Sequence, residues 1–375
     1  MEVILLLLLL YVLIYVGYIT ALCYGFTKIK TFNSVPTVPE TGFSIIIPFR
    51  TEEQNLPRLL ESLTKLNYPL DMFELIFVDD LSEDLSVKLI NRWRMENGRY
   101  QTTVLENLRL TGSPKKDAIN RAVPIVAFDW IVTTDADCSL PENWLQTLNS
   151  YIQTNDVEML AAAVAYEGKT SLLHHFERMD ILSLQGATIG SFGLGKAFMC
   201  NGANFAYTKK LFYDLGGFSN NDKLASGDDV FLLQKAVNRS PDKVHYLKSA
   251  DGIVKTNFAQ SWKQLLNQRI RWASKTTSYE NTFAEDLAII VFFANLSLVI
   301  GTSLATLSVV EWEFVLLIFV IKSIPDFILL AQANKFLYKG KFFFPLFSAV
   351  WYPFFCVVVA LWSLLGKYEW KGRKY

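Results

Sequence analysis

The stretch FSIIIPFRTEE, residues 43–53, sets the fold of this chain. Its first part, Phe43 to Phe49, is a continuous apolar run, which is typical of a strand buried on both faces of a parallel sheet. Two later runs end in acidic residues in the same way, ELIFVDD at 74–80 and WIVTTDADC at 130–138. Helical periodicity separates the runs, as in NLPRLLESLTKL after the first one. Strands that alternate with helices predict a Rossmann-like, doubly wound α/β fold with a mostly parallel sheet.

Acidic side chains follow these predicted strands, namely Glu52, Asp79, Asp80, Asp135 and Asp137. Because the carboxyl ends of parallel strands meet at one edge of a sheet, we expect these side chains to line one crevice. Unpaired like charges in a partly desolvated crevice are costly, so we expect a divalent cation there. Asp135 and Asp137 are separated by one residue and can direct both carboxylates at one hard ion. Each motif alone has a simpler explanation, since loop acids can be solvated and VDD can cap a helix.

The apolar surplus of the chain lies at its two ends. Hydrophobic residues make up 51% of the 375 positions and charged residues only 19%, more apolar surface than a soluble protein of this length can bury. The run from Val3 to Tyr24 is long enough to cross a hydrocarbon core of about 30 Å. Lys28 and Lys30 follow it, which by the positive-inside rule places the residues after them in the cytoplasm. The net charge of zero argues against a nucleic-acid-binding protein with an overall basic field.

Three more apolar segments follow the central region, at about residues 287–308, 314–330 and 342–365. Basic stretches follow the second and the third, and both favour the cytoplasmic side, so we expect only two of the three to cross. We expect the last one to lie along the cytoplasmic interface, because Pro345 and Pro353 break it into halves too short to span. The predicted division is an N-terminal transmembrane helix at 1–26, an α/β domain at 40–283, membrane segments at 286–366 and a basic cytoplasmic tail at 367–375.

Seven motifs stand in this order across the central domain: PFRTEE, VDDLSED, KKDAIN, TTDADC, GANFAY, SGDD and QRIRW. Together they resemble the inverting nucleotide-sugar glycosyltransferases of family 2, which have the GT-A fold. The Q-x-x-R-W form of the last motif resembles the membrane-integrated branch with cellulose, chitin and hyaluronan synthases and ceramide glucosyltransferases. The resemblance covers nearly the whole chain and implies a GT-A domain in the cytoplasm, one membrane helix before it and two or three after it.

The resemblance implies donor-site roles for several acidic residues and one lysine. It places Glu52, Asp79 and Asp80 at the uridine of a UDP-sugar, and Lys115 near the base or the phosphates. It assigns Asp135 and Asp137 to Mg²⁺ or Mn²⁺, held against the diphosphate.

The catalytic role falls on the SGDD motif. Asp229 occupies the place of the family's general base, and Asp228 stands where the family usually has Glu, so the choice between the two stays open. In a single displacement one carboxylate takes the acceptor proton while the metal stabilises the departing diphosphate, and no enzyme nucleophile is needed. A helix N-cap is the alternative explanation of the two aspartates.

The acceptor and diphosphate side falls on Asn204, Gln268, Arg271 and Trp272. The last three are three and four residues apart and share one helix face, which can offer a cation to the diphosphate and an aromatic platform to the acceptor. A basic helix on anionic lipid is the alternative explanation of this stretch, and a structural turn is the alternative for Asn204.

The sequence therefore predicts a glycosyltransferase in the inner or plasma membrane that moves a sugar from a UDP-sugar to a lipid or saccharide acceptor. A processive polysaccharide synthase and a non-catalytic scaffold that binds sugar nucleotides are the alternatives. Lys322 and Asp326 are four residues apart within an apolar segment, so we expect their helix face to border a lateral entrance for a lipid acceptor. A local ion pair is the alternative for these two residues.

Overall fold

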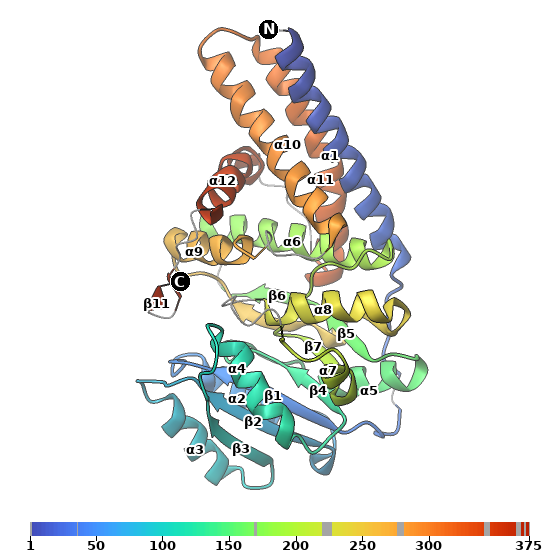
Figure 1. The fold of residues 1–375 in the computed structure, drawn as a ribbon, viewed down its shortest axis with the longest axis vertical. Helices are drawn as coiled ribbons and strands as arrows, with labels where there is room; N and C mark the ends of the chain where they lie inside the picture. The colour runs from blue at the N-terminus through green and yellow to red at the C-terminus, as the bar shows by residue number, and fades with distance from the viewer. Residues whose placement is uncertain are drawn as a thin grey trace. The chain divides into compact units, whose positions relative to one another are not determined.

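The computed structural model describes residues 2–35, 37–168, 171–219, 227–275, 281–340, 346–364, 369–370 and 373–374. The chain forms two compact units (Figure 1). The α/β unit comprises residues 30–168 and 199–257, and the helical unit comprises residues 1–29, 169–198 and 258–375. The segments 169–198 and 258–275, which the sequence placed in the α/β domain, thus group with the apolar helices. The four-part division into domains stays a prediction.

The α/β unit is built on a seven-stranded sheet in the order β3-β2-β1-β4-β7-β5-β8. The strands are β1 (Phe43–Phe49), β2 (Phe73–Asp79), β3 (Gln101–Glu106), β4 (Trp130–Thr133), β5 (Met159–Ala162), β7 (Phe205–Thr208) and β8 (Val244–Leu247). Neighbouring strands are parallel except β7, which is antiparallel to both β4 and β5. The mixed α/β fold with a mostly parallel sheet is therefore confirmed.

The run from Phe43 to Phe49 is an interior strand of this sheet. It forms β1 with the predicted bounds, and it lies between β2 and β4. Ile45, Ile46 and Ile47 are completely buried, as expected for a strand covered on both faces. β4 ends at Thr133, earlier than the run WIVTTDADC suggests, so its acids lie in the turn after the strand.

Helices cover the sheet, and a small second sheet completes the unit. The helices are α2 (Leu56–Thr64), α3 (Ser86–Glu96), α4 (Pro114–Ala122), α5 (Trp144–Thr154), α7 (Lys209–Asp214) and α8 (Asp228–Arg239). Short 3₁₀ turns lie at Leu70–Met72, Val123–Ile125, Pro241–Lys243 and Ala250–Gly252. Strands β6 (Val164–Glu167) and β9 (Val254–Asn257) pair in parallel in a separate two-stranded sheet.

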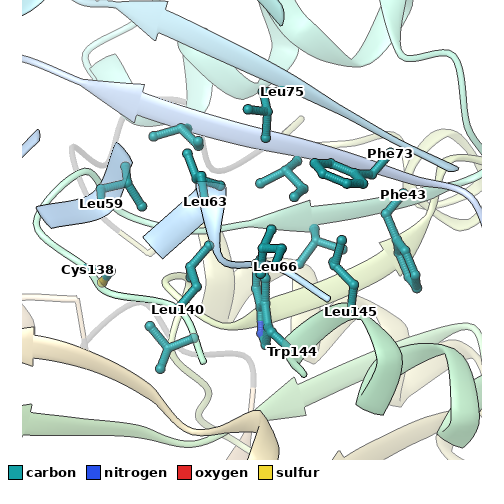
Figure 2. Close-up of a cluster of buried hydrophobic side chains, with 14 of the residues drawn as sticks. Phe43, Leu59, Leu63, Leu66, Phe73, Leu75, Cys138, Leu140, Trp144 and Leu145 are labelled. Atoms are coloured by element: carbon teal, nitrogen blue, oxygen red, sulfur yellow. The ribbon is translucent and has the colours of Figure 1, made fainter. Parts of the chain in front are cut away.

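The hydrophobic core joins β1 and β2 to α2 and α5 (Figure 2). Phe43 and Phe73 from the strands and Trp144 from α5 are among its largest buried side chains. The same cluster contains Cys138 and Leu140, which directly follow the acidic turn after β4. The core thus fixes the chain immediately beyond the turn that carries Asp135 and Asp137.

The helical unit contains α1 (Glu2–Lys28), α6 (Leu172–Gly193), α9 (Trp262–Ala273), α10 (Thr282–Thr306), α11 (Trp312–Leu337) and α12 (Leu346–Leu364). Four of them, α1, α10, α11 and α12, are long and apolar enough to cross a membrane. α1 packs against α6, α10 and α11 (Figure 1). Strands β10 (Glu369–Trp370) and β11 (Arg373–Lys374) form a short hairpin.

Glycines bring α1 and α6 into close contact. A Cβ atom on Gly25 would lie 2.1 Å from the carbonyl oxygen of Gly190, and one on Gly193 would lie 1.8 Å from that of Gly25. Only glycine permits two backbones to approach this closely, as at other helix crossings between small residues in membranes.

The predicted break at Pro353 is wrong. α12 is one helix from Leu346 to Leu364 with Pro353 inside it, and α11 likewise continues through Pro325. A proline removes one N–H from a helix, and apolar membrane helices tolerate this because neighbouring groups satisfy the freed carbonyl. Pro345 lies outside the described residues. The segment Phe347–Leu364 is long enough to span a membrane. Its interfacial position stays a prediction, and a break at Pro353 no longer supports it.

Lys322 and Asp326 form the local ion pair named above as the alternative. The Lys322 Nζ atom lies 2.8 Å from Asp326 Oδ2, and the hydroxyl of Tyr15 on α1 donates to Asp326 Oδ1. The ammonium also lies 4.5 Å from the centroid of the Tyr15 ring. The two charges are thus satisfied between α11 and α1, and they give no support to a lipid entrance.

Candidate active site

A cluster of charged side chains lies where β4, α4 and α8 begin or end. The Nζ atom of Lys115, in the first turn of α4, lies 2.7 Å from Asp135 Oδ1 and 3.5 Å from Asp228 Oδ2. Asp135 is in the turn after β4, and Asp228 is the first residue of α8. Three segments far apart in the sequence therefore meet at one ammonium group.

Electrostatics keep Lys115 charged. Burial by itself would lower the pKa of the ammonium, but the carboxylates of Asp135, Asp228 and Asp229 raise it above its ordinary value. A permanent cation in a group of acids can bind an anionic ligand without losing its proton near neutral pH.

Asp229 is held by the backbone. Its Oδ2 atom accepts a hydrogen bond of 2.8 Å from the N–H of Gly202, and its Oδ1 atom accepts one of 2.8 Å from the N–H of Val230. A Cβ atom on Gly202 would lie 3.2 Å from both Lys115 Nζ and Asp228 Oδ2. A glycine here therefore leaves space beside the charged cluster.

Glu52, Asp79 and Asp80 form a second group, which follows β1 and β2 at the same edge of the sheet. Asp80 is buried, and its Oδ1 atom accepts a hydrogen bond of 2.9 Å from the side-chain amide of Asn107. The guanidinium of Arg109 lies 3.5 Å from the same oxygen. Glu52 accepts from Asn55 at 2.7 Å, and Asp79 accepts from the N–H of Ser82 at 3.0 Å.

Several residues of this second group were not predicted from the sequence. Asn107 and Arg109 follow β3, which ends at Glu106, and no motif marked an amide or a guanidinium after this strand as a partner of Asp80. Arg50 bonds the carbonyl oxygens of Asp80 and Leu81 at 2.7 Å each, and it ties the loop after β2 to β1. Its place in PFRTEE, two positions before Glu52, was the one available signal.

Asp117 is a further acid that the sequence did not single out. It is buried, and it accepts hydrogen bonds from the N–H groups of Leu110 and Thr111 at 3.1 and 3.0 Å and from the Thr111 hydroxyl at 2.9 Å. It therefore orders the loop that leads into α4 and Lys115. An acid within KKDAIN in the first turn of a helix was a usable signal.

Asn204 makes hydrogen bonds that are typical of a structural residue. Its amide nitrogen donates to the carbonyl oxygens of Ala163 and Gly252, each at 2.7 Å. Its Oδ1 atom accepts from the indole of Trp144 at 3.0 Å. The side chain is fully buried, which favours the structural alternative, and its proposed role at the acceptor stays a prediction.

Gln268, Arg271 and Trp272 lie on α9, in the helical unit. The helix is continuous over these positions, as their spacing predicted. Their contacts with ligands stay predictions. Arg269, between them, is buried and was not singled out from the sequence.

The donor set of the acidic turn fits a hard divalent cation. Asp135 and Asp137 are partly exposed, and carboxylate oxygens are the ligands that Mg²⁺ and Mn²⁺ prefer. No group of three or more His, Cys, Asp or Glu side chains able to hold a metal ion is found within the described residues. Mg²⁺ usually binds through one or two protein carboxylates together with substrate phosphates, and a site formed by Asp135 and Asp137 has this composition.

Two glycosyltransferases of known sequence are similar to this chain. The chain is 22% identical over 261 residues to the glycosyltransferase AglE of Haloferax volcanii. This match covers 67% of the chain and 80% of AglE. The chain is 26% identical over 259 residues to the probable glycosyltransferase YdaM of Bacillus subtilis, and this match covers 66% of the chain and 60% of YdaM.

A solved structure shows the same fold. The mannosyltransferase PcManGT from Pyrobaculum calidifontis, in complex with GDP-Man and Mn²⁺, superposes with a TM-score of 0.62 and 16% identity. The match covers 90% of this chain and 100% of that structure. At this identity the likeness concerns the fold alone.

The family profile described as Glycosyl transferase family 21 matches residues 12–375. This range includes the α/β unit and nearly all of the helical unit. The prediction of a glycosyltransferase that uses a nucleotide sugar is confirmed, while family 2 membership and inversion stay predictions. The chain belongs to Glycosyl transferase family 21 and is a glycosyltransferase.

Proposed function

We propose that this protein transfers a sugar from a UDP-sugar to a lipid acceptor in a membrane, with inversion and with the help of a divalent metal. The observation that carries the proposal is the cluster in which Lys115 contacts Asp135 and Asp228 beside Asp229. It contains the three kinds of group that this reaction needs: carboxylates for a metal, a cation for the diphosphate and a carboxylate for the acceptor proton.

In the proposed donor site, Glu52, Asp79 and Asp80 bind the uridine, and Lys115 binds the diphosphate. Asp135 and Asp137 would hold Mg²⁺ or Mn²⁺, which when bound stabilises the negative charge of the departing UDP. The complex of the mannosyltransferase PcManGT with GDP-Man and Mn²⁺ supports a nucleotide sugar and a divalent ion, and it makes a GDP-sugar the competing donor.

Asp229 is the proposed general base. It removes the proton from the acceptor hydroxyl as that oxygen attacks the anomeric carbon, and the bond from this carbon to the diphosphate oxygen breaks. Asp228 lies 3.5 Å from the Lys115 ammonium, so we assign it to holding that cation rather than to the acceptor proton. An α-linked donor then gives a β-linked product.

The acceptor side is assigned to α9. Gln268 and Arg271 are proposed to contact the diphosphate, and Trp272 is proposed to provide an aromatic surface for the acceptor. This assignment rests on the Q-x-x-R-W motif and on the shared helix face of the three residues.

The membrane arrangement follows from the apolar helices and the charges beside them. We propose that α1, α10 and α11 span, that α12 lies along the cytoplasmic leaflet and that the α/β unit faces the cytoplasm, since Lys28 ends α1 and basic residues end α11. Few spanning helices favour a lipid acceptor over a polymer that must be secreted through a channel, so a processive synthase is the second candidate.

The purified protein in detergent, supplied with membrane lipid extract and a panel of UDP- and GDP-sugars, tests this proposal. We expect release of UDP from one UDP-sugar, together with a glycosylated lipid of defined size. A long polymer would identify a synthase, release of GDP would overturn the donor assignment, and binding without any release would identify a scaffold.

A further inference from the structure

Helix α9, which carries the Q-x-x-R-W motif, is attached to α6 within the helical unit at two places. Near its N-terminus, the carboxylate of Glu177 accepts a hydrogen bond of 2.9 Å from the N–H of Ala259, and the ring of Phe176 packs 5.2 Å from that of Trp262. Farther along, Nε of Arg269 donates to Oδ2 of Asp180. The first attachment does not involve Arg269.

Arg269 is buried and makes three different contacts. Besides the bond to Asp180, its Nη1 atom donates to Oε1 of Gln268. Its guanidinium also lies 4.2 Å from the centroid of the Trp272 ring, a cation–π contact. Both side chains that Arg269 holds belong to the motif, whereas Arg269 occupies one of its two variable positions.

Asp180 supports this arrangement from α6. It is buried like Arg269, with 3% and 5% of their surfaces exposed, so each charge depends on the other for compensation. The planar guanidinium fork can serve a carboxylate and an amide along its edge and an indole on its face at once, which a lysine ammonium cannot do. With Oε1 of Gln268 occupied by Arg269, the amide offers N–H donors to a ligand, which suits a phosphate oxygen.

We infer that Arg269 is a positioning residue for sugar transfer, held by Asp180, which orients the Gln268 amide and the Trp272 indole. This inference rests on the proposed function of α9 at the acceptor and the diphosphate. Arg269 touches neither the donor nor the acceptor in this account. It acts by reducing the number of orientations that the two motif side chains can adopt before the acceptor binds.

The test compares Arg269→Lys and Asp180→Asn with the wild type and with Lys263→Met, an exposed residue on the same helix. The readout is the ratio of sugar transfer to lipid over hydrolysis of the donor by water. A loss of folded protein lowers both rates equally and leaves this ratio unchanged. A misplaced acceptor platform lowers transfer alone.

We expect the ratio to fall about 10- to 100-fold in Arg269→Lys, and to fall in Asp180→Asn because a neutral amide holds a guanidinium less firmly than a carboxylate does. Lys263→Met should keep the wild-type ratio, and Asp180→Glu should restore most of it because the charge returns. An unchanged ratio in both Arg269→Lys and Asp180→Asn overturns the inference. If Arg269→Lys does not accumulate, Asp180→Asn and Asp180→Glu decide the matter by the same ratio.

Two further variants separate this inference from the proposed function. If Gln268→Ala and Trp272→Ala leave transfer intact, the proposed role of α9 is wrong. If these two abolish transfer while Arg269→Lys and Asp180→Asn keep the wild-type ratio, the role of α9 stands and only the positioning role of Arg269 is overturned.

Discussion

The ammonium of Lys115 lies 2.7 Å from the Oδ1 atom of Asp135, although one residue lies in the first turn of α4 and the other follows β4. This contact brings together two motifs that the sequence could only place in the same domain. It also connects the proposed cation for the diphosphate directly to a proposed metal ligand. The proposed donor site depends on this pair.

Replacing Lys115 by Met should lower kcat by about 10²-fold, because a preorganised cation at the departing diphosphate is lost. Lys115→Arg should retain part of the activity, since it keeps the charge. Steady-state rates of UDP release measure both variants, with Lys88→Met, an exposed lysine on α3, as the control. Wild-type kcat in Lys115→Met would remove Lys115 from the donor site.

The pH dependence of the same rate has a definite sign. Because the pKa of Lys115 is raised, its stabilising contribution is complete below the unfolded pKa of about 10.4 and is lost only as pH rises through the higher folded pKa. Lys115 therefore stays protonated between about pH 7 and pH 9. If the wild-type rate falls in this range, the rate of Lys115→Arg should fall in the same way, because the loss does not come from deprotonation of Lys115.

Asp229→Asn should bind UDP with nearly wild-type affinity and lose transfer, whereas Asp228→Asn should be milder. A base contributes about 10²- to 10⁴-fold to the rate and little to donor binding. Calorimetry gives the affinity for UDP, and product formation gives the rate. The opposite order of the two losses would assign the base to Asp228.

Gly190→Ala should destabilise the helical unit by about 1–3 kcal/mol, because a Cβ atom there would lie 2.5 Å from the carbonyl oxygen of Leu22. Gly17→Ala is the matched control, since it lies in α1 and its Cβ atom would meet nothing within 4 Å. Thermal unfolding in detergent should show a lower midpoint for Gly190→Ala and no loss for Gly17→Ala. Equal midpoints would show that α1 and α6 accommodate a Cβ atom at Gly190 with no loss of stability.

The side of the C-terminal tail follows from the proposed position of α12. A cysteine in place of Lys374 should react with an impermeant reagent only from the cytoplasmic face of sealed vesicles. Labelling needs the native Cys356 replaced, because it is partly exposed, while Cys23, Cys138 and Cys200 are buried. Reaction from the external face alone would mean that α12 spans the membrane.

Local sequence pattern predicted the fold well where burial alone decides the structure. The run from Phe43 to Phe49 forms β1 with the expected bounds because it is covered on both faces. The same reasoning failed at Pro353, since proline rules from soluble helices overestimate the cost of an interrupted hydrogen bond in an apolar helix.

The candidate site was predictable in part. Acids at the ends of strands could be placed at one sheet edge, because that follows from topology. The contact of Asp180 with Arg269 joins residues 89 positions apart, and no periodicity encodes such a pair. Asn107 and Arg109 were missed for a similar reason, since their partner Asp80 lies on the loop after a different strand.

Sugar transfer should depend on a metal ion held by the acidic turn, and a product assay with and without metal measures this dependence. UDP and glycosylated lipid are quantified for the wild type, Asp135→Asn and Asp137→Asn in saturating Mg²⁺ or Mn²⁺ and again with a chelator. We expect the wild type with metal to form glycosylated lipid and to release at least as much UDP, and to form neither product with chelator. Both variants should lose turnover and retain their thermal midpoints. Full activity of either variant, or wild-type turnover in the presence of the chelator, would contradict this expectation.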